Sequence, residues 1–251
     1  MVMNATGFGE AQVLARRDWA DGLFSITLNV HDLVFEAGQF VNLALDVGEA
    51  RVRRSYSIAS APGAALEFYV TRVEGGVLTP RLSELQPGDP VWVEARPAGF
   101  FTLSWLPESA KELWMLATGT GLGPFLSMLR TGRTWERFDR AVLVHCVRYR
   151  SHLGYREELR ELEKRFAQFS YLPLVTREPQ ETDVCAGRIP TLIKAGELER
   201  QVGLAFNPEH AHFMLCGNPQ MIKDTELALA ERGFRRHRRR QPGHVTSEKY
   251  W

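Results

Sequence analysis

Residues 112–130 read ELWMLATGTGLGPFLSMLR, an apolar run followed by a glycine-rich turn and a second apolar stretch. The run predicts a buried strand, and Pro124 suits the first turn of a following helix. Glycines at 119, 121 and 123 allow a tight turn and a close approach to a ligand, and helix amides can face an anion. The stretch is a candidate dinucleotide site. Because proline stands three positions after Gly121, the turn does not match the GxGxxG motif, and it also lacks the GK[ST] ending of a nucleotide-triphosphate loop. A tight turn with a purely structural role explains the pattern about equally well.

The same alternation continues toward the C-terminus. Three more apolar runs, separated by helical patterns, stand at 141–147, 171–176 and 212–217. The clearest helical pattern is residues 155–169, where one face carries Tyr155, Leu159, Leu162 and Phe166. Strand and helix in repeated alternation predict a parallel sheet with crossover helices.

The first half has a different rhythm. Short alternating segments separated by turn residues stand at 24–30, 39–47, 66–73 and 91–95. They favour an antiparallel barrel or sandwich. The rhythm changes in the proline-containing stretch 104–111, so we place the boundary at about residue 106. The two rhythms predict an N-terminal antiparallel barrel or sandwich, residues 1–106, followed by a C-terminal parallel-sheet α/β domain, residues 107–251.

Composition limits the functional classes. The 251 residues carry a net charge of +1, which gives no global attraction to nucleic acid or an anionic membrane. The three cysteines are widely spaced and include no CxxC pair, so we expect no disulfide framework, no structural metal and no iron-sulfur site. With no signal-peptide pattern and no spanning apolar run, we expect a cytoplasmic, soluble protein, by default a monomer.

Arginines follow several predicted strands of the second half. Arg148, Arg177 and Arg188 each stand at or just after a strand or before a helix. Each alone is most often a solvated charge. Because guanidinium forks match phosphate geometry, the three at one sheet edge are candidates for binding a cofactor with an additional phosphate.

The last predicted strand ends in CGNPQMI at 216–222. Cys216 and Gly217 fall at the carboxyl end of a parallel strand, where ligands bind in open α/β sheets. Asn218 and Pro219 predict the cap and first turn of a helix. A small buried hydrophobe is the alternative for Cys216. Its position opposite the GTGLGP loop favours the site.

RVRRSYSIAS at 51–60 places a cation, an aromatic ring and a hydroxyl within four positions, at Arg54, Tyr56 and Ser57. This combination suits a flat, anionic ligand. The alternative is a strand that uses Tyr56 as core.

GGVLTPRL at 75–82 predicts a turn that leads into a short helix, TPRLSEL, at 79–85. We expect Thr79 as its N-cap and Pro80 at N1. A capped helix N-terminus is itself an anion site, so the structural and functional interpretations agree.

Two further segments lie near the C-terminus. HVTSEKYW at 244–251 predicts either an edge strand with an exposed end or a stacking lid over a planar ligand, to which Glu248 would bring a carboxylate. RRHRRR at 235–240 predicts a docking surface for an acidic protein partner or a solvated helix terminus. Nucleic acid is disfavoured because no recognition motif accompanies the run.

Four motifs together, RSYS at 54–57, GGVLTP at 75–80, GTGLGP at 119–124 and CGNPQM at 216–221, resemble the ferredoxin-NADP reductase family in order and spacing. The resemblance spans residues 10–251 and is closest to the bacterial ferredoxin/flavodoxin-NADP reductases. It implies an FAD-binding β-barrel domain over 1–106 and an NADP-binding α/β domain with a C-terminal aromatic tail over 107–251.

The resemblance also implies roles for single residues in FAD binding. In the family, the residue matching Arg54 contacts the flavin pyrophosphate, that matching Tyr56 packs on the isoalloxazine ring, and that matching Ser57 lies near N5. Thr120 resembles the threonine between flavin and nicotinamide, and Trp251 is expected over the flavin or the adenine. The further FAD residues implied are Ser55, Phe68, Tyr69, Val70, Thr71, Gly76, Val77, Leu78, Thr79 and Tyr250.

For NADP(H), the residues implied are Arg148, Tyr149, Thr176, Arg177, Arg188, Cys216, Gly217, Asn218 and Asp224. The implied reaction is electron transfer between NADPH and a one-electron carrier, an acidic ferredoxin or flavodoxin, by hydride transfer to FAD N5 followed by single-electron steps. Ser57, Cys216 and Glu248 are its expected catalytic residues. The alternatives are an NADH-linked flavin or oxygenase-component reductase of the same fold and, in a different class, a noncatalytic dinucleotide-binding regulator.

Overall fold

The computed structural model describes residues 7–250, so Trp251 lies outside the described residues. The chain divides into two compact units, each described by itself. The first contains residues 7–102 and 123–131, and the second contains residues 103–122 and 132–250. Within residues 7–250, no helix combines the length and the apolar character needed to cross a membrane.

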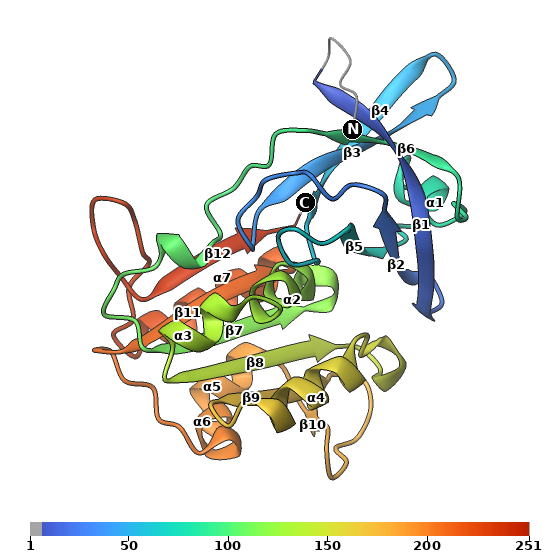
Figure 1. The fold of residues 1–251 in the computed structure, drawn as a ribbon. Helices are drawn as coiled ribbons and strands as arrows, with labels where there is room; N and C mark the ends of the chain where they lie inside the picture. Colours follow the sequence, from blue (N-terminus) through green and yellow to red (C-terminus); the bar gives the residue numbers. More distant parts are fainter. Residues whose placement is uncertain (1–6, 251) are drawn as a thin grey trace. The chain divides into compact units, whose positions relative to one another are not determined.

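The first unit is built on an antiparallel six-stranded sheet (Figure 1). Its strands are β1 (Phe8–Ala20), β2 (Leu23–Leu28), β3 (Phe40–Val47), β4 (Ala50–Ser57), β5 (Leu66–Thr71) and β6 (Pro90–Glu94). Their order is β4-β3-β6-β1-β2-β5, and the end strands β4 and β5 also contact each other, so the sheet curls on itself. Alternation on β2 points Phe24, Ile26 and Leu28 into the core. The antiparallel first half is confirmed.

Two helices belong to this unit, α1 (Thr79–Leu82) and α2 (Gly123–Leu129). All seven residues of α2 are buried. Ser127 Oγ donates to the Ser60 carbonyl at 2.6 Å, while Arg130 Nη1 donates to the Ala59 carbonyl at 2.9 Å and pairs with Glu67 Oε2 at 2.5 Å. The predicted helix after the glycine loop therefore exists, and these contacts hold it to the first unit.

The second unit contains the predicted parallel sheet. Its strands are β7 (Glu112–Thr118), β8 (Arg140–Val147), β9 (Phe169–Val175), β10 (Cys185–Ala186), β11 (Ala211–Gly217) and β12 (Val245–Lys249). The order is β10-β9-β8-β7-β11-β12, and every neighbouring pair is parallel. The four predicted apolar runs are the central strands β9, β8, β7 and β11. The sheet places all their carboxyl ends on one edge.

Helices cover both faces of this sheet (Figure 1). One side carries α3 (Gly132–Arg137) and α4 (Arg156–Arg165), joined by the stacked rings of Trp135 and Phe166 with centroids 3.9 Å apart. The other side carries α5 (Ile189–Lys194), α6 (Glu197–Val202) and α7 (Pro219–Ala230), whose apolar residues share one core cluster with the strands. Three short 3₁₀ helices complete the unit, η1 (Leu103–Trp105), η2 (Gly119–Leu122) and η3 (Arg150–His152).

The C-terminal segments differ in outcome. The edge strand expected near the end of the chain is confirmed, because β12 pairs with β11 as the last strand of the sheet. The helix terminus expected at 235–240 is wrong. Helix α7 ends at Ala230, and residues 235–240 form an irregular loop in which Arg238 bridges to Gln241. All five arginines of this loop are exposed.

Candidate functional site

The carboxyl edge of the parallel sheet is formed by two loops in close contact. Gly121 lies against β11 so closely that a Cβ built on it would stand 2.5 Å from the Cys216 carbonyl oxygen. Gly217 has a φ of +125°, and a Cβ there would collide with Thr118. The Asn218 amide donates to Thr118 Oγ1 at 2.8 Å. The predicted juxtaposition of the GTGL turn and Cys216 is confirmed. Gly121 is required by space, and Gly217 is required both by space and by its backbone angle.

The N-terminus of α7 follows directly from this edge. Asn218 is the N-cap, and its Oδ1 accepts from the amides of Gln220 at 2.9 Å and Met221 at 3.1 Å, with Pro219 in the first turn. The predicted cap is confirmed. Asp224, one turn later, accepts from the Gln220 side chain at 2.8 Å.

Asn218→Ala is expected to lower the free energy of unfolding by about 1 kcal/mol, because two helix amides lose their acceptor. Urea denaturation followed by far-UV circular dichroism would measure it. The matched control is Gln220→Ala, whose side chain makes only an exposed bond to Asp224. Equal midpoints for Asn218→Ala and the parent protein would contradict the capping role.

Cys216 lies in the middle of a group of candidate residues. Its side chain is fully buried, and the strand register places it opposite Glu248 on β12. Burial raises the pKa of the Cys216 thiol well above its ordinary value, the Glu248 charge raises it further, and the Tyr250 side chain partly opposes this. The Tyr250 amide donates to the Gly217 carbonyl at 3.1 Å. The thiol is therefore neutral near pH 7, which suits packing against a ring and not attack as a thiolate.

Thr120, the other candidate on this edge, is buried within η2. Nearby, the buried imidazole of His145 on β8 lies with Nε2 3.0 Å from the Gly119 carbonyl oxygen. Because a carbonyl only accepts, Nε2 carries the proton and donates. His145 thus anchors the first residue of the glycine turn.

The three candidate arginines all lie beyond the carboxyl ends of their strands. Arg148 follows β8 and Arg177 follows β9, and the Arg177 amide donates to the Arg148 carbonyl at 3.0 Å. Arg188 is the N-cap of α5. Burial raises the pKa of the Cys146 thiol, at the end of β8, to about 11, and the Arg188 charge partly opposes this rise. The structure thus brings the three backbones to one edge.

The guanidinium groups of these arginines are exposed. Arg177 Nη1 donates to Tyr149 Oη at 3.3 Å, and its guanidinium carbon lies 5.8 Å from the centroid of the Tyr149 ring. Thr176 continues the ladder, with its amide donating to the Val147 carbonyl at 3.0 Å. Within residues 7–250, none of the three arginines forms an ion pair, so all can accept an anion.

In the first unit, the RSYS segment forms the end of β4. Arg54 is exposed and donates to the Arg53 carbonyl at 2.7 Å, while Tyr56 packs partly against the core. Burial raises the Tyr56 pKa, so its phenol stays protonated. Strand alternation places Arg54 and Tyr56 on one face of β4 and the buried Ser57 on the other. Ser55 Oγ donates to Asn42 on the neighbouring β3 at 2.8 Å.

On β5, the candidate side chains alternate in the same way. Phe68 and Val70 belong to the core cluster of the unit. Tyr69 points to the other face, where its ring meets Trp19 edge-on with centroids 6.3 Å apart, and Thr71 is exposed. On the face away from the core, Thr71 is therefore the side chain open to a ligand, whereas the Tyr69 side chain is buried.

The turn before α1 departs from the prediction for Thr79. The N-cap position is occupied by Leu78, which is buried, and Thr79 is the first helical residue. Its Oγ1 accepts from the Val73 amide at 2.9 Å, so the hydroxyl closes the turn behind it and cannot cap the helix. The helix also ends at Leu82, short of residue 85. Glycine is needed at position 76, because a Cβ there would stand 2.9 Å from the Val73 carbonyl oxygen. The next residue, Val77, is exposed.

Two residues near the arginines were missed by the sequence interpretation. Arg150 and Glu178 form a contact across the β8 and β9 connections, with the Arg150 amide donating to Glu178 Oε2 at 2.5 Å. They are 28 positions apart, and no local pattern relates them.

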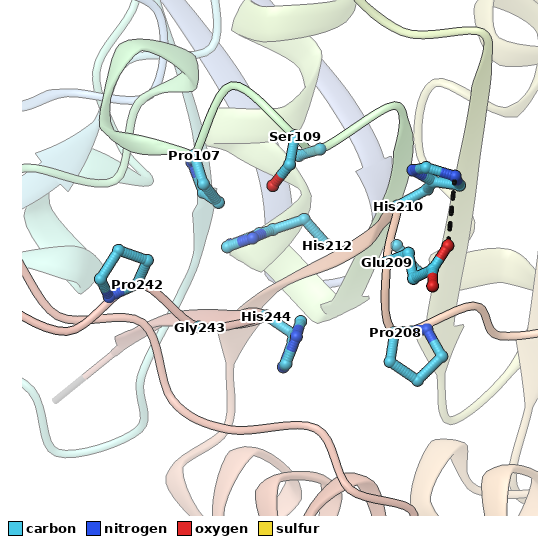
Figure 2. Close-up of a pocket in the computed structure, with 11 residues that line it drawn as sticks. Pro107, Ser109, Pro208, Glu209, His210, His212, Pro242, Gly243 and His244 are labelled. Atoms are coloured by element: carbon cyan, nitrogen blue, oxygen red, sulfur yellow. Dashed lines mark ion pairs between the residues drawn. The ribbon is translucent and has the colours of Figure 1, made fainter.

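A small pocket of about 90 Å³ lies at the opposite, amino edge of the same sheet (Figure 2). Its lining includes His210, His212 and His244, and it contains none of the candidate site residues. His212 is buried, and its Nε2 lies 2.9 Å from Thr246 Oγ1. Figure 2 shows His210 beside Glu209, and His210 Nε2 lies 3.9 Å from Glu209 Oε2. The pocket is therefore separate from the carboxyl edge.

Comparisons with known proteins agree with the two-part organisation. The family model for the oxidoreductase FAD-binding domain matches residues 15–102, and that for the oxidoreductase NAD-binding domain matches residues 115–227. The flavodoxin/ferredoxin–NADP reductase of Escherichia coli strain K12 is 46% identical over 237 residues, covering 94% of this chain and 95% of that protein. The ferredoxin–NADP reductase of Pseudomonas aeruginosa is 37% identical over 235 residues, covering 89% and 90%.

Among solved structures, a ferredoxin NADP⁺ reductase from Neisseria gonorrhoeae with bound FAD and NADP superposes with a TM-score of 0.92 at 31% identity. The match covers 97% of this chain and 98% of that one. Identity and coverage of this extent confirm the resemblance drawn from the four motifs. The chain belongs to the flavodoxin/ferredoxin–NADP reductase family.

Proposed function

We propose that this chain is an FAD enzyme that transfers electrons between NADPH and an acidic one-electron carrier, a ferredoxin or a flavodoxin. Two relatives are named flavodoxin/ferredoxin–NADP reductases, and one solved relative holds both FAD and NADP. The observation that carries the NADP assignment is the set of three exposed arginines at the carboxyl edge of the parallel sheet, none of which forms an ion pair within residues 7–250. We assign residues 1–106 to the FAD domain and residues 107–251 to the NADP(H) domain.

The residues of the first unit fit a flavin dinucleotide. Arg54 offers an exposed guanidinium to a pyrophosphate, and the Tyr56 ring offers a partly exposed apolar face. Gly76 allows the tight turn before α1, because a Cβ there would stand 2.9 Å from the Val73 carbonyl oxygen. When bound, FAD supplies the chemistry by accepting a hydride at N5 and releasing electrons singly.

The chain itself binds and orients. Ser57 is assigned a hydrogen bond at N5, and the protonated Cys216 thiol packs against the nicotinamide. Glu248, opposite Cys216 in the strand register, is assigned proton movement. Arg148, Arg177 and Arg188 bind the 2′-phosphate. The further FAD and NADP contacts implied by the family motifs, including Thr120 and Tyr250, complete the proposed site.

Anaerobic stopped-flow reduction of the purified protein tests this proposal at flavin wavelengths. At matched subsaturating concentrations, NADPH is expected to reduce the flavin about tenfold or more faster than NADH, since a charge-assisted phosphate contact is lost with NADH. Arg177→Met should lower the ratio of the reduction rate with NADPH to that with NADH. Equal rates would instead favour an NADH-linked flavin or oxygenase-component reductase, and a colourless protein would favour a noncatalytic dinucleotide-binding regulator.

A further inference from the structure

The connection after β9 carries a carboxylate directly beside the proposed phosphate site. Glu178 follows Arg177 in sequence, and its charge acts on the same imidazole, His152, as the charge of Arg148. Left free, this carboxylate would repel a bound phosphate or pair with one of the exposed arginines. Either effect would weaken recognition of a 2′-phosphate.

Arg150 engages this carboxylate in two ways. Its backbone amide donates to Glu178 Oε2 at 2.5 Å, and its Nη1 lies 3.6 Å from the same oxygen. Its Nη2 pairs with Glu181 Oε1 at 3.1 Å and donates to the Pro179 carbonyl. The Arg150 side chain is only 20% exposed, whereas the arginines of the proposed phosphate site are open to solvent.

The contacts of Arg150 point away from a role as a direct phosphate ligand. Its guanidinium is already occupied by two carboxylates and a carbonyl. Arg148 and Arg177, by contrast, are held together through their backbones, and neither forms an ion pair within residues 7–250. Arg150 therefore neutralises nearby carboxylates, whereas Arg148 and Arg177 present exposed guanidinium groups.

We propose that Arg150 is a positioning residue that sequesters the Glu178 carboxylate, so that Arg148 and Arg177 stay unpaired for a 2′-phosphate. The inference rests on the proposed NADP(H) function and adds a specificity determinant to it. It requires no contact between Arg150 and the nucleotide. Removal of Arg150 should harm recognition of the 2′-phosphate, and removal of the Glu178 charge should repair that harm.

Isothermal titration of the FAD-loaded protein tests the proposal without using activity. The two probes are adenosine 2′,5′-bisphosphate and adenosine 5′-monophosphate, which differ by the 2′-phosphate. Arg150→Met removes the guanidinium that faces Glu178 and leaves the backbone amide bond to this carboxylate in place. The variant is expected to bind the bisphosphate roughly threefold to tenfold more weakly, with little change for the monophosphate, because only the 2′-phosphate is repelled by the Glu178 charge that is no longer neutralised. The loss should shrink at high salt.

The double variant Arg150→Met/Glu178→Gln is expected to restore bisphosphate affinity to within about twofold of the parent protein. Arg156→Met is the matched control. Arg156 pairs with Asp183 in the same connection, so it also pins the segment but does not engage Glu178. Its selectivity between the two probes should stay unchanged.

Four outcomes would overturn the proposal. An Arg150→Met variant with parental selectivity would show that Glu178 needs no partner. A loss that the double variant does not restore would mean that Arg150 acts by another route, and an equal loss in Arg156→Met would reduce the effect to loop anchoring. If the parent protein itself binds both probes equally, the proposed NADP(H) preference fails, and this inference fails with it.

Discussion

Gly121→Ala is expected to lower the free energy of unfolding by about 3 kcal/mol or more, through a steric clash alone. The added Cβ would stand 2.5 Å from the Cys216 carbonyl oxygen, 2.7 Å from its carbonyl carbon and 2.8 Å from Gly217 Cα. All three are backbone atoms of β11, which is paired on both sides. No rotamer change can relieve the contact, so η2 or β11 must move.

Two glycines of the same unit separate this clash from other effects of losing a glycine. Gly119→Ala adds a side chain at a φ of +54° with nothing within 4 Å, so it should cost only the backbone penalty, about 1 kcal/mol. Gly132→Ala meets only the Glu136 side chain, at 3.6 Å, and should be nearly neutral. Denaturant unfolding of the three variants, with pyridine nucleotide affinity measured beside it, provides the comparison. A Gly121→Ala protein as stable as Gly119→Ala would contradict the close approach of the two loops.

The same contact explains why this part of the fold was predictable. An apolar run such as residues 112–118 indicates a strand buried on both faces. The glycines that follow indicate a turn with no room for side chains. Both signals are local. Asn218 and Pro219 likewise mark the start of α7 within two positions.

For other strands the pairing partner and register could not be predicted, because this pairing is not local. β4 is an edge strand whose residues are mostly exposed and include three arginines, so its burial shows little alternation. β12 lies beside β11 although 28 positions separate Gly217 from Val245, and no run of apolar residues marks it. Register between distant strands depends on the whole sheet.

Side-chain hydrogen bonds are harder still to predict from sequence. Thr79 has a residue type typical of an N-cap and stands beside a helix start, but its hydroxyl accepts from the Val73 amide and makes no capping bond. Arg150 and Glu178 meet only because β8 and β9 are neighbours. The candidate site was therefore predictable as a set of backbone loops, while the contacts that tune its charge required the structure.

A second large effect is expected from pH, because two buried histidines of the parallel-sheet unit are held neutral. Burial lowers the pKa of His145 to about 4, partly opposed by its hydrogen bond to the Gly119 carbonyl. Burial also lowers the pKa of His212 to about 3, and the charges of His237, His244 and Arg137 lower it further. Both values lie below the ordinary histidine pKa of about 6.5 that applies to the unfolded chain.

The sign of the effect follows from proton binding. Between pH 6.5 and the folded pKa values, the unfolded chain binds protons at these two sites and the folded chain does not, so stability falls as pH falls. Each histidine contributes a slope of about 1.4 kcal/mol per pH unit in this window and nothing above it. Lowering the pH from 7 to 4.5 should therefore remove several kcal/mol, a large part of the stability of an ordinary domain.

Urea unfolding at several pH values between 4.5 and 7.5 should show this slope, and variants identify its source. His212→Gln is expected to reduce the slope by about 1.4 kcal/mol per pH unit, whatever it does to stability at pH 7. His210→Gln, in the same pocket but exposed, is the matched control for replacing a histidine there (Figure 2). His145→Gln should reduce the slope too and, because His145 anchors Gly119, also weaken nucleotide binding at neutral pH. A parental slope in both buried-site variants would mean that carboxyl groups, and not these imidazoles, govern acid unfolding.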